Sequence, residues 1–137
     1  MNKHPYIRAY LAGIAVPTLA LLIIMTAYAF FRYVCNIPIP VERLIVFPMA
    51  AVPNIWGLWN VLYVAAIARR NVPLGLYGGF LPLLLGPLGY GVAHLLDFAI
   101  PHVAFRVLPF ALPAALILYY LVWKHIVGFL NRELGIA

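Results

Sequence analysis

A cluster of aromatic and ionisable side chains has residue types that suit metal or proton chemistry. Tyr90, His94 and Asp97 share one helix face by their spacing, and His102 follows a few residues later. Two histidines and a carboxylate can bind zinc or another divalent metal ion. His94 with Asp97 also suits a proton relay, because ionisable groups inside apolar segments often serve that purpose.

The same cluster has a structural alternative. The spacing of His94, Asp97 and His102 matches no standard metal motif. An interfacial ion-pair network, in which Asp97 pairs with Arg43 or Arg106, is the default interpretation of these residues. The sequence alone leaves the metal site, the proton relay and the ion-pair network open.

A second group of side chains suits the recognition of an apolar ligand. Trp56, Trp59, Asn60 and Tyr63 recur at i, i+3, i+4 and i+7, which places them on one helix face. Aromatic walls with one amide group are typical of a pocket for an apolar solute, and Tyr90 is a further candidate for its lining. The alternative is an aromatic face toward helices or lipid, with Asn60 hydrogen-bonded across a helix interface.

The elements that must position these groups are predicted to be membrane-spanning helices. The chain is 66% hydrophobic and 9% charged, whereas soluble domains are about 45–50% apolar and about 25% charged. Four runs approach the roughly 20 apolar residues that cross a bilayer. They cover residues 11–31, 44–68, 74–96 and 107–127. The last run extends past Lys124 to residue 127, because a lysine side chain can direct its ammonium group to the membrane surface.

The fold class that follows is all-α: one domain, residues 1–137, forming an integral membrane bundle of four transmembrane helices, up-down-up-down. The first run is longer than a signal-peptide core of about 7–15 residues, so a retained helix is expected. Cytoplasmic loops are enriched in Lys and Arg. The N-terminus, second loop and C-terminus are therefore expected to be cytoplasmic, since they hold Lys3, Arg8, Arg69, Arg70, Lys124 and Arg132, against Arg32, Arg43 and Arg106 on the other side.

Small residues predict where helices pack closely, because they let two backbones approach. The third run has such a seam, and the second has a weaker one around Gly57. We expect the second and third helices to pack together through these seams. The seam of the third run comprises Gly75, Gly79, Gly86, Gly89 and Ala93.

Prolines predict kinks in the second and third helices, because each proline removes a backbone donor. Pro48 and Pro53 lie in the second run, and Pro82 and Pro87 lie in the third. The two runs align at an offset of 34 positions with the shared pattern P-x4-P-x2-[WY]-G-x2-[NH]. Because adjacent spans run in opposite directions, such a repeat would be inverted across the membrane, as is common in transporters. The match has two explanations, a common origin of the two spans or chance.

Three functions are compatible with these features. The leading one is a non-enzymatic helix-packing module of the cell membrane, multi-pass, acting as an oligomer or as an accessory subunit of a membrane complex. The alternative is a small transporter or binding protein with an apolar pocket between the second and third helices. The weakest is a membrane metalloprotein that uses His94, Asp97 and His102.

The remaining features argue against several other classes. The sequence has no Gly-rich phosphate loop, Ser-His-Asp pattern or HExxH motif, so an enzyme is not favoured and no cofactor is identified. The basic residues lie between and beyond the apolar runs, which indicates contact with the lipid bilayer and not with nucleic acid. The single cysteine, Cys35, excludes an internal disulfide.

Overall fold

A computed structural model describes residues 4–136, and all regular structure in this range is helical. Four helices are long and apolar enough to cross a membrane: Pro5–Tyr33, Val41–Arg70, Leu74–Leu95 and His102–Glu133. This confirms the all-helical class and the four candidate spans, and it indicates a multi-pass membrane protein. Lys3, used above for orientation, lies outside the described residues.

The first candidate span is one continuous helix, whereas the other three are composite. The first span is α1 (Pro5–Tyr33). The second span begins with α2 (Val41–Leu44) and the π-helical turn η1 (Ile45–Met49). It continues with α3 (Val52–Leu62), a second π-helical turn η2 (Tyr63–Ile67) and the short η3 (Ala68–Arg70). The third comprises α4 (Leu74–Gly79) and α5 (Leu81–Leu95), and the fourth α6 (His102–Val122), the π-helical η4 (Trp123–Val127) and α7 (Gly128–Glu133). The fourth span therefore continues beyond residue 127, where the apolar run was expected to end.

Proline accounts for the breaks in the second and third spans. Regular helical structure stops at residues 50–51, just before Pro53, and again at Phe80, just before Pro82. Proline has no N–H to donate to the preceding turn, so helical bonding is interrupted there. Pro53 and Pro82 are not equivalent positions in the 34-residue alignment, so the two spans do not share one local structure.

Each of the four spans is followed, within three residues, by a residue in the left-handed backbone region. Asn36, Asn71, Asp97 and Gly135 have φ angles of 55°, 56°, 53° and 66°. These residue types adopt that conformation at the lowest cost, and they commonly terminate helices. After Asp97 the chain closes the helix end with a 2.8 Å hydrogen bond from the Phe98 N–H to the Ala93 carbonyl.

The first two spans form a tight hairpin through small residues. A β-carbon built on Gly13 would lie 2.6 Å from the carbonyl oxygen of Trp56, and one built on Gly57 would lie 2.5 Å from the Tyr10 ring. Ala9 and Ala12 of α1 are buried. The seam around Gly57 therefore faces the first span, and not the third as expected.

The third and fourth spans form a second hairpin of the same kind. A β-carbon on Gly75 would lie 2.9 Å from Cβ of Lys124, and one on Gly78 would lie 1.9 Å from Cγ of Trp123. The expected close approach of the second and third backbones is not seen at Gly57 or Gly75, where the hairpin partner occupies the seam. Further along the third span, a β-carbon built on Gly89 would contact the Phe47 ring of the second span, and Ala93 is half-buried. A β-carbon built on Gly86 would have no side chain and no backbone of another span within 4 Å.

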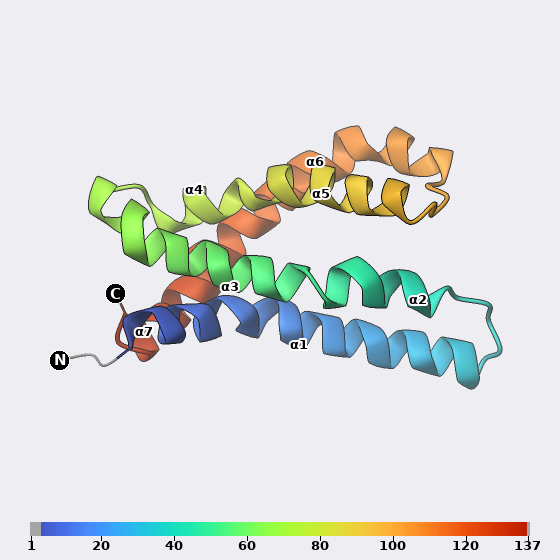
Figure 1. Cartoon of the computed structure of the whole chain (residues 1–137), viewed down its shortest axis with the longest axis horizontal. Coiled ribbons are helices and arrows are strands. Elements are labelled where there is room, and N and C mark those ends of the chain that lie inside the picture. The colour runs from blue at the N-terminus through green and yellow to red at the C-terminus, as the bar shows by residue number, and fades with distance from the viewer. Residues whose placement is uncertain (1–3, 137) are drawn as a thin grey trace.

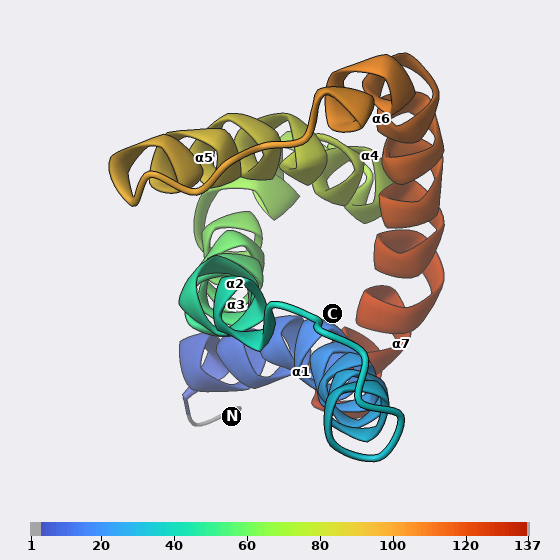
Figure 2. The ribbon, with the colours of Figure 1, turned by 90° about the vertical axis from the view of Figure 1, so that its right-hand side faces the viewer.

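The two hairpins meet at the end that carries both termini and diverge toward the other end (Figure 1). The fourth span runs from the second hairpin across to the first, so that α7 reaches the start of α1, where the Arg8 guanidinium donates to the Leu134 carbonyl at 3.2 Å. Seen from the diverging end, the start of α6 stands far from α1 and α2 (Figure 2). The helices therefore do not close into a bundle along their whole length.

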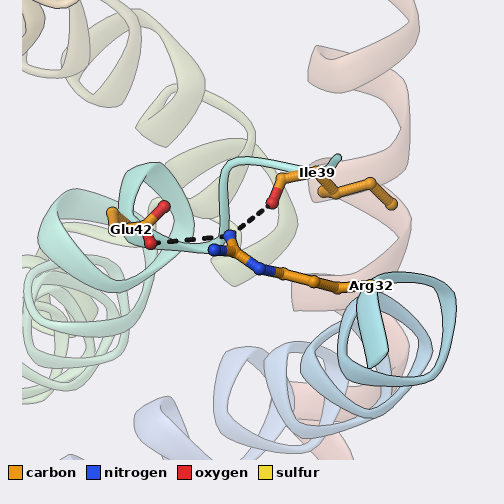
Figure 3. A network of polar contacts seen from close by, with 3 residues as sticks. All are labelled: Arg32, Ile39 and Glu42. Atoms are coloured by element: carbon orange, nitrogen blue, oxygen red, sulfur yellow. Dashed lines mark hydrogen bonds and ion pairs between the residues drawn. The ribbon is translucent and has the colours of Figure 1, made fainter. Parts of the chain in front are cut away.

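At the diverging end, arginines hold the connecting segments. Arg32 donates to the Ile39 carbonyl at 2.8 Å and lies 3.5 Å from a Glu42 carboxylate oxygen, which folds the first loop back on α1 (Figure 3). Arg43 donates to the Ala99 carbonyl at 3.2 Å. The second contact links the first hairpin to the loop between α5 and α6.

Candidate functional site

The centre of the molecule is an aromatic core at the meeting point of the second, third and fourth spans. Trp123 is fully buried, and its ring centroid lies 5.2 Å from that of Trp56. Leu81, Leu85 and Val127 complete the buried cluster. Trp123 occupies this place because Gly78 has no side chain, which lets the indole lie directly on the α4 backbone.

A pair of buried asparagines ties three spans together beside this core. Asn60 and Asn131 have exposed fractions of 0% and 1%. Asn60 Nδ2 donates to Asn131 Oδ1 at 2.8 Å, and Asn131 Nδ2 donates back to Asn60 Oδ1 at 3.1 Å. The second hydrogen of Asn60 goes to the Ala9 carbonyl of α1 at 2.8 Å. Buried amides must be hydrogen-bonded, and this reciprocal arrangement fixes the positions of α1, α3 and α7.

The other aromatic residues expected to line a pocket are also engaged. The Trp59 ring stacks on Tyr77 at 4.7 Å between centroids, and its indole N–H donates to the Tyr77 carbonyl at 3.2 Å. The Tyr63 hydroxyl donates to the Val72 carbonyl at 2.8 Å. Tyr90 is 55% exposed and contacts Phe105, away from the rest. The structure thus brings Trp56, Trp59, Asn60 and Tyr63 together as an interlocked layer and leaves Tyr90 apart.

The aromatic core contains polar groups that lack hydrogen-bond partners. Within residues 4–136, no acceptor lies in hydrogen-bond geometry with the indole N–H of Trp56 or Trp123, or with the Tyr77 hydroxyl. Such groups cost free energy when buried, so ring packing must hold the cluster together. The core has no carboxylate, imidazole or ammonium group, and its arrangement suits helix packing more than bond-making chemistry.

The residues expected to bind metal or relay protons are spread over an exposed helix end. His94, Asp97 and His102 are all exposed, and the described residues contain no group of three His, Cys, Asp or Glu side chains that could hold a metal ion. The helix ends at Leu95, so helical spacing no longer places Asp97 on the face of His94. Arg43 contacts the Phe98 ring and the Ala99 carbonyl, and no ion pair joins it to Asp97 in the described chain.

The backbone role of Asp97 leads to a testable prediction. Asp97→Gly is expected to preserve thermal stability in detergent, because glycine enters the left-handed region freely. Asp97→Val is expected to cost about 1–2 kcal/mol, because a β-branched residue is strained there. Equal losses in the two variants would instead indicate that the carboxylate itself is required.

Several residues of the site were not found from the sequence. Asn131 lies past the predicted end of the fourth run, and Gly13 and Gly78 were not placed in any seam. A signal for the first hairpin was present, since Ala9, Ala12 and Gly13 recur at i, i+3 and i+4. No comparable signal pairs Asn60 with Asn131, which are 71 residues apart.

Comparisons with protein-family models, with curated proteins and with solved structures found no match. The helices themselves indicate the class of protein, because four of them within residues 4–136 are long and apolar enough to cross a membrane, which suggests a multi-pass membrane protein. Its buried centre consists of an aromatic core and an amide pair, both of which join separate spans.

Proposed function

We propose that this chain is a non-enzymatic helix-packing module of the cell membrane that works as an oligomer or as a subunit of a larger membrane complex. The supporting observation is the divergence of the hairpins, which leaves every residue from 101 to 111 exposed. These residues include Val103, Phe105 and Phe110, so the surface is apolar. A second helix set would complete the bundle that this chain leaves open.

The middle of α5 offers a place for such a partner. A β-carbon built on Gly86 would have no side chain and no backbone of another span within 4 Å. The next residue, Pro87, has no N–H to give to the carbonyl of Leu83. In hydrocarbon a freed carbonyl needs a donor from protein or water. A partner helix can approach closely at Gly86 and supply one, which is how small residues act in membrane helix association.

The proposed orientation has both termini in the cytoplasm. Six of the nine basic residues belong to the terminal end and its connecting loop, including the adjacent Arg69 and Arg70. That loop is short, so the charge rule has full force there. The interruptions near Pro53 and Pro82 then lie within the membrane, where freed backbone carbonyls need a donor from protein or water.

The interlocking of Trp56, Trp59 and Asn60 weighs against the alternative of a transporter with a pocket at these residues. The Trp56 ring packs on Trp123 of the fourth span, and the Trp59 indole donates to the Tyr77 carbonyl of the third. The Asn60 amide is hydrogen-bonded to the fourth span and to α1. The exposure of His94, Asp97 and His102 likewise gives no support to a metalloprotein. Helix association therefore remains the function that the geometry favours.

Substitution at Gly86 tests the proposal. Gly86→Leu is expected to reduce association at least tenfold while leaving the fold of the single chain unchanged, because its side chain enters space that is empty in the monomer. Gly91→Leu is the matched control, since Gly91 also has empty space around it but lies on a different face of α5. Native mass spectrometry from mild detergent reports the associated copies or partner.

The wild-type protein is expected to carry a fixed number of additional copies or one stable partner, and Gly91→Leu is expected to retain them. A wild-type protein that is monomeric under all mild extraction conditions would contradict the proposal. Equal loss of association in Gly86→Leu and Gly91→Leu would contradict the assigned face.

A further inference from the structure

A cavity of about 450 Å³ opens at the terminal end, where the second, third and fourth spans meet. Its walls come from η2, α4 and α7, among others, and include Tyr63, Val64 and Leu74. Pockets of this size are large enough for a small ligand or a headgroup. The cavity is separate from the Gly86 face of α5, so what it binds does not depend on the proposed association.

Two cations line this cavity without a counter-ion. Lys124 and Arg132 are both on its wall, and neither forms an ion pair within the described residues. The Lys124 ammonium lies 5.6 Å from the centroid of the Tyr120 ring. A guanidinium nitrogen of Arg132 lies 3.8 Å from the position of a β-carbon on Gly128, another wall residue. Both charged groups are thus held beside the cavity.

No acidic side chain is placed to neutralise these charges. The chain contains three acidic residues, and none of them lines the cavity. Glu42 belongs to α2 and Asp97 follows α5, and Glu133 is exposed. Among residues 4–136 no carboxylate therefore balances Lys124 and Arg132, and an anion bound in the cavity would do so.

The cavity also offers an amide donor. Asn131 lines it and is 1% exposed. One hydrogen of its Nδ2 goes to Asn60, and within residues 4–136 the other hydrogen has no acceptor. An ammonium, a guanidinium and an amide around one space form a set of donors that suits a phosphate group.

From this arrangement we infer that the cavity binds a phosphate group, as the headgroup of an anionic membrane lipid or as the free ion. Basic pockets between spans on the cytoplasmic side commonly hold lipid headgroups. An apolar groove of about 310 Å³, lined by Leu76, Phe80 and Ile117, also borders Tyr120. An acyl chain would find an apolar surface there, next to the bound headgroup.

The test uses the whole chain, stripped of lipid in detergent and titrated in about 0.3 M salt, which screens exposed charges. Native mass spectrometry compares phosphatidylglycerol with phosphatidylcholine of the same acyl chains. The variant Lys124→Gln/Arg132→Gln removes both cations but keeps their methylene stems. Arg69→Gln/Arg70→Gln removes two exposed charges of the same membrane face and is the matched control.

One phosphatidylglycerol per chain is expected, binding at least tenfold more tightly than phosphatidylcholine. We expect Lys124→Gln/Arg132→Gln to weaken it roughly tenfold or more, and Arg69→Gln/Arg70→Gln to change it less than about twofold. Ala68→Trp, which fills the cavity without changing charge, is expected to weaken binding as well. It serves as the second variant if the first fails to fold.

Inorganic phosphate distinguishes the two sources of the group. Displacement of phosphatidylglycerol by an equal concentration of phosphate would assign the cavity to the free ion, and retention would assign it to the lipid. Equal losses in the two double-glutamine variants, or equal binding of both lipids, would overturn the inference. General attraction to surface charge would then explain the data.

Discussion

Gly78→Ala is expected to destabilise the protein by about 1–3 kcal/mol, whereas Gly86→Ala in the same span is expected to leave stability unchanged or slightly higher. The added methyl at position 78 would lie 1.9 Å from Cγ and 2.2 Å from Cδ2 of Trp123. Those atoms belong to a fully buried ring and cannot move without displacing Trp56. At position 86 the methyl meets nothing within 4 Å.

Thermal or denaturant unfolding in detergent, followed by tryptophan fluorescence, measures this difference. Both variants gain the same helix propensity from alanine, so the difference between them isolates the contact with Trp123. Stabilities that agree within about 0.5 kcal/mol, the usual effect of a surface substitution, would show that Trp123 does not pack on the α4 backbone.

The asparagine pair is expected to show strong coupling. Asn60→Leu or Asn131→Leu alone should cost about 1–3 kcal/mol, because each removes hydrogen bonds from its buried partner. Within residues 4–136, Asn60→Leu leaves the Asn131 amide without a partner, and Asn131→Leu leaves Asn60 with only its bond to the Ala9 carbonyl. The double variant should cost less than the sum of the two, because both unpaired groups are gone. A double-mutant cycle is expected to give a coupling energy of about 0.6–2 kcal/mol, the range for hydrogen bonds between membrane helices.

The cycle needs a control that keeps the same volumes. Leu58→Asn places an amide on an exposed position of α3, and its effect should add to that of Asn131→Leu. Additivity of Asn60→Leu and Asn131→Leu, within about 0.3–0.5 kcal/mol, would contradict the direct contact between the two amides.

The helices themselves could be predicted because their signals are local. Apolar runs, the basic residues beside them and the prolines within them act over a few turns of chain. Asn71 and Asp97 also mark helix ends through their own backbone preferences. The fourth run was predicted to end at residue 127, although the helix continues to Glu133.

The pairing of helices could not be predicted because a small-residue seam does not identify its partner. Gly57 was expected to face the third span, but the first span offers Ala9, Ala12 and Gly13 at matching spacing. The site of Asn60 required Asn131, which is distant in sequence and outside the predicted run. The shared face of His94 and Asp97 was derived from helical spacing, which does not hold for Asp97 because the helix ends at Leu95.

The most direct test of the proposed membrane topology uses Cys35, the single cysteine, which is exposed between the first two spans. A membrane-impermeant maleimide added to intact cells is expected to label Cys35. In the variant Cys35→Ser/Arg70→Cys, labelling is expected only after permeabilisation. Labelling of position 70 in intact cells, or protection of Cys35 there, would contradict a four-span protein with both termini in the cytoplasm.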